Sequence, residues 1–444
     1  MTYGAAVTDW IKSTSEASAD TAGSRDGQVP VKRVISGPGS QLEPEGSSGS
    51  LSRPVAFAAI TAIFVLFASA ASAPTPLYVV FQREWGFSTS MLTVIFAVYV
   101  VGLIGSLLVL GGLSDHVGRR PVLATAIGME ALSFVLFLVA SGVTVLLAAR
   151  VAQGIATGMA FSTLGATLVD LNPRHSPGRA GLVNGVAPIG GLAFGALGSG
   201  ALVEFAPAPT HLVFALLLVG TGFAAVVIAR LPETSARRPG VLASLVPVLG
   251  IPPRLRGDVY ALLPILVASW ALGGLYLSLG PSVAVGLFGL SNHLIGGLLV
   301  TLLCGAGALT AFAIRAWPGE RVVGVSATLL SAGTALTIVG VELHAVVLAG
   351  AGTLIAGVGF GASALATFGT LARLAGPGER SELLAVALVI AYLAFSLPAV
   401  AAGFATSSVG LHATTVVYGL GVVALGLMAL TAQRLRSVRE VVDG

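Results

Sequence analysis

The sequence predicts an all-α integral membrane protein with twelve transmembrane helices in two six-helix halves. Of its 444 residues, 55% are hydrophobic and only 9% are charged, whereas a water-soluble domain carries about a quarter charged residues. Apolar runs of about 20 residues, the length of a helix that crosses a bilayer, recur from Val55 onward. The longest polar break, at 231–258, divides these runs six and six, which indicates two halves.

The apolar runs are predicted to be helices because they are continuous and lack the alternation of membrane-spanning strands. The 58 glycines suit helices that pack closely in a bilayer. The predicted spans are residues 55–80, 92–112, 121–141, 144–169, 180–203, 211–230, 259–287, 292–315, 320–341, 345–372, 383–405 and 412–432.

The segments outside the spans complete the predicted organisation. Residues 1–52 are rich in Ser, Gly and Glu, so we expect a disordered cytoplasmic tail. No apolar core follows the first residues, which argues against a signal peptide. The expected order is this tail, a six-helix half at 53–230, a cytoplasmic linker at 231–258, a second half at 259–432 and a cytoplasmic tail at 433–444.

Basic residues are distributed unevenly among the loops. With the N-terminus in the cytoplasm, 21 of the 23 Lys and Arg fall in cytoplasmic segments. Arg83 alone lies in an external loop, and Arg150 lies within a span. Because basic loops stay inside, we expect both termini in the cytoplasm and the protein in the cell's inner (plasma) membrane. The basic residues form no patch, so the net charge of +4 does not indicate nucleic-acid binding.

A turn rich in glycine and charge joins spans two and three. Asp115 can accept hydrogen bonds from a helix N-terminus, Gly111 and Gly118 permit a tight turn, and Arg119 and Arg120 stay at the cytoplasmic surface. An ordinary basic turn is the alternative interpretation. The full segment is Gly111-Gly112-Leu113-Ser114-Asp115-His116-Val117-Gly118-Arg119-Arg120.

This segment resembles the signature of the major facilitator superfamily in the same loop, with His116 at a position that is usually basic. Asp170, at the cytoplasmic end of span four, matches the acid that pairs with the loop arginine in that family. The resemblance covers the membrane region and implies the major facilitator fold. It also implies a charge relay of Asp115, Asp170 and either Arg119 or Arg120, which latches the outward-open state.

Span four carries Arg150, and a charge within a span is a functional-site hypothesis by default. Arg150 lies about two turns from the external face, so the alternative is that its side chain reaches the interface. Together with Gln153 and Gly154, and with Gly158 one turn later, Arg150 resembles a second signature found in proton-coupled members of the superfamily. That resemblance implies an arginine that faces the cavity.

Glu130 in span three is the only carboxylate near the predicted bilayer midplane. The spacing along the two spans places Glu130 and Arg150 about 7 Å apart in depth, so two long side chains could meet if they share a face. Burial disfavours the charged carboxylate and a nearby guanidinium favours it, as a group that gains and loses a proton requires. A structural, hydrogen-bonded glutamate is the alternative.

Span five contains Gly185, Pro188, Gly190 and Gly191. Small residues let helices approach closely, and proline loosens the helix, so the alternative to a functional hinge is plain close packing. The run resembles the antiporter signature of drug–proton exchangers, although Ala187 stands where glycine is usual.

Span one contains Pro74 and Pro76, which must bend or interrupt the helix, and broken helices line substrate cavities. This pair resembles the first-span proline motif of the twelve-span drug exporters. That motif often travels with an acid in span one, which this sequence lacks.

The leading functional expectation is a monomeric secondary transporter that works by alternating access around a site at the midplane. We expect proton-coupled efflux of a small, largely apolar molecule, with the proton and the bilayer as partners. An uptake symporter or facilitator for a small metabolite, and a non-transporting membrane sensor, are the alternatives. No enzyme, metal or cofactor is expected, because Cys304 is the sole cysteine and no nucleophile–base pair or ligand cluster lies in the spans.

Overall fold

The computed structural model describes residues 51–173, 175–176, 178–247, 249–317, 319–376 and 379–443. The first 50 residues of the predicted N-terminal tail lie outside the described residues. Within the described ranges the regular secondary structure is entirely helical, as the sequence predicts.

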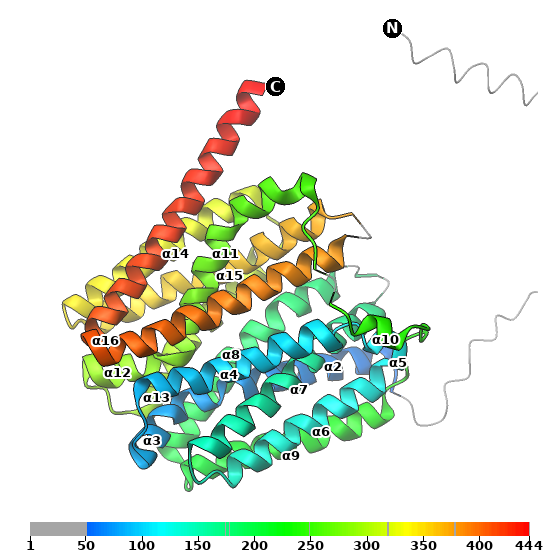
Figure 1. Ribbon diagram of the computed structural model, residues 1–444, viewed down its shortest axis with the longest axis horizontal. Coiled ribbons are helices and arrows are strands. Elements are labelled where there is room, and N and C mark those ends of the chain that lie inside the picture. Colours follow the sequence, from blue (N-terminus) through cyan, green and yellow to red (C-terminus); the bar gives the residue numbers. More distant parts are fainter. Residues whose placement is uncertain are drawn as a thin grey trace, which may run out of the picture. The chain divides into compact units, whose positions relative to one another are not determined.

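The described chain forms two groups of helices joined by the segment from Leu231 to Pro252, with the first group blue to green in Figure 1 and the second green to red. The first group consists of α2 (Arg53–Ser72), α3 (Pro74–Trp85), α4 (Thr89–Leu110), α5 (Ser114–Val117), α6 (Arg119–Leu138), α7 (Val143–Asp170), α8 (Arg179–Phe205) and α9 (Pro209–Arg230). The joining segment contains the short helix α10 (Val241–Ser244). The second group consists of η1 (Pro253–Leu255), α11 (Arg256–Ser278), α12 (Gly280–Phe288), α13 (His293–Ala313), α14 (Gly319–Glu342), α15 (Val346–Leu374) and α16 (Arg380–Asp443).

Eleven helical stretches in the described residues are long and apolar enough to cross a membrane, and the last of them comprises two predicted spans. That stretch, Glu382–Arg434, has 53 residues and would extend about 80 Å as one helix, against a hydrocarbon core of about 30 Å. At Gly410 the backbone has φ 82° and ψ 163°, which is not helical. There α16 turns back on itself without a loop (Figure 1), so the stretch crosses twice. Past residue 432, where the last span was expected to end, α16 continues as a helix to Asp443.

The proline pair of span one interrupts the helical hydrogen bonding but leaves the backbone dihedral angles between α2 and α3 helical. Ala73, between α2 and α3, has φ −54° and ψ −37°, and its N–H still donates to the carbonyl of Ser69. Pro74 therefore begins α3 at a first-turn position, where proline fits because the first N–H groups of a helix have no intrahelical partner. The missing N–H of Pro74 nevertheless leaves the carbonyl of Ala70, four residues earlier, without its helical donor.

The two halves meet at the end that lies away from α5 and α10. Thr301 of α13 donates to the carbonyl of Ala193 on α8 at 3.0 Å, and Thr75 of α3 donates to the carbonyl of Leu277 on α11 at 3.1 Å. On α8, Gly200 lies so close to α13 that a Cβ there would be 3.0 Å from the carbonyl oxygen of His293. These contacts close the two halves on each other at this end.

Inside the first half, α7 packs directly on the backbone of α4. A Cβ at Gly154 would overlap the carbonyl oxygen of Tyr99, so no larger residue fits without moving one helix. Gly158, one turn later, faces the carbonyl of Leu103 in the same way. Close packing at Gly154 and Gly158 thereby brings α4 against the α7 face that carries Arg150 and Gln153.

We expect Gly154→Ala to lower the stability of the purified protein in detergent by about 1–3 kcal/mol, because the added methyl overpacks the α4–α7 contact. Gly105→Ala in α4 is the matched control, since a Cβ there meets nothing within 4 Å. The control should be neutral or gain up to about 1 kcal/mol, because alanine is the better helix former. Thermal unfolding measures both, and equal melting temperatures for the two variants would contradict the packing argument.

Candidate functional site

A polar cluster is buried inside the first half, where Glu130 of α6 and Arg150 and Gln153 of α7 come together. Glu130 and Gln153 are 0% exposed and Arg150 is 1% exposed. Arg150 Nη1 donates to Gln153 Oε1 at 2.5 Å, and Gln153 Nε2 donates to Glu130 Oε1 at 3.5 Å. Gln153 thus bridges the arginine and the glutamate, which the sequence expected to approach each other directly. The Arg150 side chain lies within the bundle and does not extend to an interface.

The cluster is anchored on the interrupted helix of span one. Gln153 Nε2 donates to the carbonyl of Ala70 at 3.0 Å, the acceptor that Pro74 leaves without its helical donor. Arg150 Nη1 lies 3.4 Å from the carbonyl oxygen of the next residue, Ala71. The proline of span one and the polar residues of span four are therefore two parts of one site, a connection that the sequence analysis did not make.

Aromatic rings take the place of a direct counter-ion for Arg150. The guanidinium carbon of Arg150 lies 4.3 Å from the ring centroid of Tyr99 and 5.9 Å from that of Tyr78. Such cation–π contacts strengthen when they are shielded from water. Two polar atoms of the cluster, Glu130 Oε2 and Arg150 Nε, are buried and have no hydrogen-bond partner among the described residues. The cluster is thus only partly satisfied, which is uncommon for buried polar groups.

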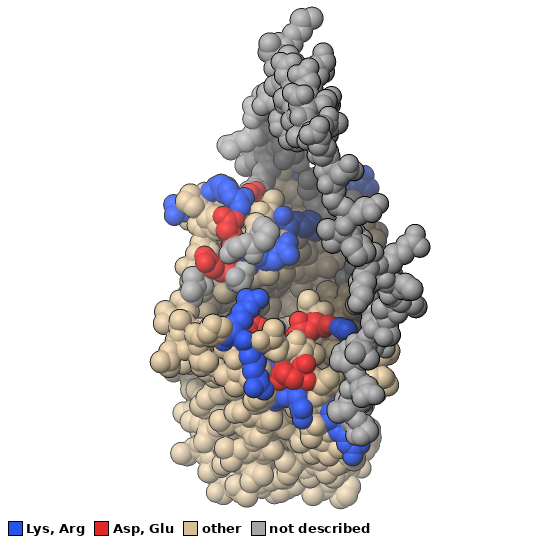
Figure 2. All heavy atoms as spheres, turned by 90° about the vertical axis from the view of Figure 1, so that its right-hand side faces the viewer, with Lys and Arg blue, Asp and Glu red and all other residues tan. Residues whose placement is uncertain are grey.

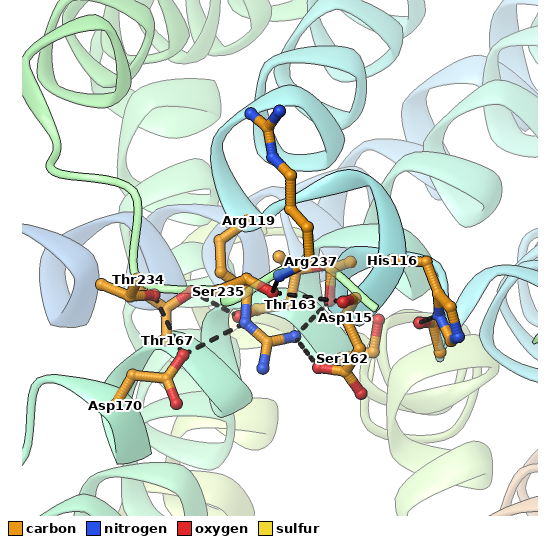
Figure 3. A network of polar contacts seen from close by, with 12 residues as sticks. Asp115, His116, Arg119, Ser162, Thr163, Thr167, Asp170, Thr234, Ser235 and Arg237 are labelled. Atoms are coloured by element: carbon orange, nitrogen blue, oxygen red, sulfur yellow. Dashed lines mark hydrogen bonds and ion pairs between the residues drawn. The ribbon is translucent and has the colours of Figure 1, made fainter. Parts of the chain in front are cut away.

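The charged turn forms a second site at the other end of the first half (Figure 3). Arg119 of α6 lies between two acids: its Nη1 is 2.6 Å from Asp115 of α5, and its Nε is 3.2 Å from Asp170 at the end of α7. Thr234 of the joining segment donates to Asp170 at 3.0 Å. The arginine that lies between the two acids is Arg119, and Arg120 reaches the carbonyl of Ala229 instead.

Glu233 is a further residue of this site, which the sequence analysis placed only in the predicted linker at 231–258. Its carboxylate accepts from the backbone N–H groups of Arg119 and Arg120 at the start of α6, at 2.8 and 3.2 Å, and from those of Thr234 and Ser235. Partial burial favours the neutral acid, but these N–H donors prevail and lower the pKa of Glu233 below its usual value. The signal available in the sequence was an acid directly after span six, since acids favour helix N-termini such as the start of α6.

Gly118 makes room for that carboxylate. Its φ of 113° is one that residues with a side chain rarely adopt. A Cβ at Gly118 would also lie 2.7 Å from Glu233 Oε2. Acidic and basic side chains gather on this end of the molecule, which Figure 2 shows face on. In the part of the chain that the structure describes, the hydrogen-bond and ion-pair partners of Asp115, Arg119 and Asp170 belong to the first half and to the joining segment.

The contact between the halves contains a pairing of Glu204 with His293 that the sequence analysis did not predict. Glu204 at the end of α8 accepts from the backbone N–H of His293, which begins α13, at 2.9 Å. Its Oε2 also lies 3.1 Å from His293 Nδ1. A carboxylate at a helix N-terminus is favoured by the helix dipole, so one acid holds a helix start of the opposite half. Asn292, a good N-cap residue, is the feature of the sequence that could have located the start of α13.

Of the remaining predicted packing residues, some contact a neighbouring helix closely and others do not. Gly191 packs against Ala68 of α2, and Pro188 lies within a continuous α8. Gly111, which follows α4, has helical dihedral angles. A Cβ at Gly190 would reach Ala308 of the second half at 3.7 Å, whereas one at Gly185 would meet nothing within 4 Å. Close packing in α8 is therefore concentrated in the part beyond Pro188.

Among the described residues, no group of three or more His, Cys, Asp and Glu could hold a metal ion.

A helical bundle of two halves, with charges buried inside one of them, defines a polytopic membrane protein of the transporter class. The chain belongs to the Major Facilitator Superfamily, whose family model matches residues 58–397.

Three solved structures share the fold at low sequence identity. A bacterial homolog of the human lysosomal transporter Spinster, in an inward-facing and unoccupied conformation, is 15% identical with a TM-score of 0.68, over 86% of this chain and 97% of its own. The human organic anion transporter MFSD10 (TETRAN) is 18% identical with a TM-score of 0.62, over 86% of this chain and 100% of its own. The xylose transporter XylE from E. coli, in an inward open conformation, is 14% identical with a TM-score of 0.65, over 85% of this chain and 95% of its own. These likenesses show that the chain has the fold of these three proteins.

We expect Glu204→Gln to loosen the contact between the halves, because it removes the negative charge that His293 and the α13 N-terminus share. The readout is the reaction of a water-soluble maleimide with Ala193→Cys in a Cys304→Ala background, since the side chain of Ala193 is buried and faces Gly305 of α13 in the opposite half. Labelling of the purified protein should accelerate about fivefold.

Glu342→Gln is the matched control for this experiment. Glu342 pairs with His412 at 3.5 Å entirely within the second half, so its loss should leave the labelling rate unchanged. Equal rates in the Glu204→Gln and Glu342→Gln variants would show that the Glu204–His293 pair does not hold the halves together.

Proposed function

We propose that the protein is a secondary active transporter that exports a small, largely apolar molecule in exchange for protons. The observation that carries this proposal is the incompletely satisfied polar cluster of Glu130, Gln153 and Arg150 inside the first half. A buried ionisable residue within a span marks a functional site by default. Span one resembles that of twelve-span drug exporters, span four that of proton-coupled members and span five that of drug–proton exchangers, and together these resemblances favour antiport and efflux over uptake.

The orientation follows from the distribution of basic residues. With 21 of 23 Lys and Arg on the side of the termini, we propose that both termini are cytoplasmic in the plasma membrane. The contact between the halves would then be the external gate, and the charged turn with Asp115 would face the cytoplasm. In intact cells, an impermeant maleimide added outside should reach the Ala193→Cys variant only in this orientation.

Glu130 is the proposed proton carrier. Its Oε1 is bound by Gln153, while its Oε2 has no donor among the described residues, so a proton can be added at Oε2 without breaking a hydrogen bond. Arg150 stays charged at neutral pH and is held by Gln153 and the two tyrosine rings. Its proposed role is to favour the ionised form of Glu130 when the two side chains approach, which releases the proton as access alternates.

Glu130→Gln should abolish coupling, because glutamine resembles the protonated acid and cannot release a proton. The assay uses proteoliposomes loaded with the pH indicator pyranine and the neutral fluorophore N-phenyl-1-naphthylamine as the transported probe. Proton movement on addition of the probe should fall to the level of protein-free liposomes. Movement of the probe down its own gradient should continue.

Ser133→Ala is the matched control for Glu130→Gln. Ser133 is also fully buried on α6, and its Oγ likewise has no partner among the described residues, but it carries no proton that could be exchanged. Ser133→Ala should retain proton movement. Retained proton movement in Glu130→Gln would assign Glu130 a structural role and make facilitated diffusion the better interpretation.

The charged turn is the proposed conformational latch. Asp115 is 46% exposed along its side chain and Arg119 only 10%, so Asp115 retains a free face at this end of the molecule. We propose that this face meets the second half when the cytoplasmic end closes, which stabilises the outward-open state. The segment around Glu233 and Thr234 would hold Arg119 and Asp170 in place for that contact.

Asp115→Asn should shift the balance between the two states without weakening equilibrium binding of the probe. With the outward-open state destabilised, Ala193→Cys should react more slowly with maleimide, and turnover should fall. Asp258→Asn is a control that removes an acid from the first turn of α11, in the second half. Unchanged labelling and turnover in Asp115→Asn would refute the latch.

A further inference from the structure

Tyr99 of α4 lies between the buried charge cluster and the second half. Its ring centroid is 4.3 Å from the guanidinium carbon of Arg150, and Tyr99 is only 5% exposed. The hydrophobic core that contains Tyr99 is built from residues of both halves, among them Phe395 of α16. Tyr99 therefore belongs to the charge cluster and to the contact between the halves at the same time.

Side chains of the second half lie next to Tyr99 along α4. Phe96, one turn before Tyr99, has its ring centroid 5.1 Å from that of Phe395. The phenol groups of Tyr99 and Tyr392 of α16 are close enough to interact electrostatically. Tyr392 lies 4.9 Å from Trp270 of α11 between ring centroids, and these two rings are only partly buried. The second half thus covers Tyr99, and this cover is thin at Tyr392 and Trp270.

Tyr78, the other ring beside Arg150, lies in a different core. Its centroid is 5.9 Å from the guanidinium carbon of Arg150, and Tyr78 is 1% exposed. The described members of the core around Tyr78 all belong to the first half. Separation of the halves would therefore uncover Tyr99 and leave Tyr78 buried.

Water at Tyr99 would change the charge cluster in two ways. A cation–π contact weakens when water reaches it, so the ring of Tyr99 would hold Arg150 less firmly. Water at Arg150 is also near Glu130, because Gln153 is bonded to both side chains. Glu130 can then exchange a proton with that water through its free Oε2.

We propose that the Tyr99 ring is the seal that keeps external water from the proton site at Glu130, and that this seal opens when the halves separate. Tyr99 acts through Arg150 and through the exclusion of water, so it is a positioning residue. The proposal deepens the proposed function and rests on it, because it names the residue that links proton uptake to the separation of the halves. It places proton uptake in the outward-open state, as the exchange of an internal substrate for external protons requires.

The test measures how fast a water-soluble carbodiimide, with glycinamide as the amine, converts the Glu130 carboxyl to an amide in the purified full-length protein. Mass spectrometry of the peptide that contains Glu130 gives the rate. Tyr99→Ala should accelerate the reaction about tenfold, because the ring no longer shields the cluster. Tyr99→Phe keeps the ring and should react as slowly as the unmodified protein.

Two further variants separate a seal from a general loosening of the fold. Phe134→Ala is the matched control: Phe134 is fully buried one turn from Glu130 on α6, in the core whose described members belong to the first half. It should leave the rate unchanged. Tyr392→Ala leaves every residue of the first half intact but thins the cover over Tyr99, and it should accelerate the reaction about threefold.

The outcomes distinguish a failure of this inference from a failure of the proposed function. Equal rates in Tyr99→Ala and Phe134→Ala would overturn the seal, and so would a Tyr392→Ala variant that reacts at the rate of the unmodified protein. If the rates change as expected but Glu130→Gln retains proton movement in proteoliposomes, the seal over the cluster stands and Glu130 fails as the proton carrier.

Discussion

The burial of Arg150 without a directly bound carboxylate is the constraint on which the first half depends. A guanidinium cannot lose its charge at neutral pH, and leaving it unpaired in an apolar interior would be very costly. The chain meets that requirement with a glutamine oxygen, two tyrosine rings and a backbone carbonyl, drawn from the four helices α7, α4, α3 and α2. Each of those helices must therefore keep its position for the cluster to exist.

Span one supplies the backbone carbonyls that accept hydrogen bonds from this cluster. A proline in a helix normally weakens it by leaving one carbonyl without a donor, yet here the acceptor of Ala70 is taken up by Gln153. The close approach of α4 and α7 at Gly154 brings Tyr99 near the same cluster. The second half contains no corresponding cluster among its described residues, and a pocket there is lined by apolar side chains and hydroxyls.

The sequence predicted the helical class and the spans, because hydropathy is a property of neighbouring residues. The pairing of a loop arginine with Asp115 and Asp170 came from the resemblance to a known family, which left open which arginine pairs. The sequence predicted the depths of Glu130 and Arg150 but not that Gln153 lies between them, because depth follows from counting residues, whereas the rotation of each helix follows from tertiary packing. Glu233 and Glu204 were missed for a related reason: each caps a helix from another part of the chain. The sequence analysis placed Gly410 in a loop between two spans. Instead, a single non-helical residue reverses the helix there, and no polar segment marks the reversal.

Main-chain atoms form part of the contact between the halves, at Gly200 and Gly297 and at the carbonyls of Ala193 and Leu277. A side chain can yield to a small displacement by changing its rotamer, but a main-chain surface has no such freedom. Two such surfaces either fit or separate, and intermediate spacings lose the contact without gaining another. The geometry of this contact between the halves therefore favours an abrupt transition between two arrangements over a gradual widening. It also makes the rate at which the halves separate sensitive to any atom added at Gly200 or Gly297.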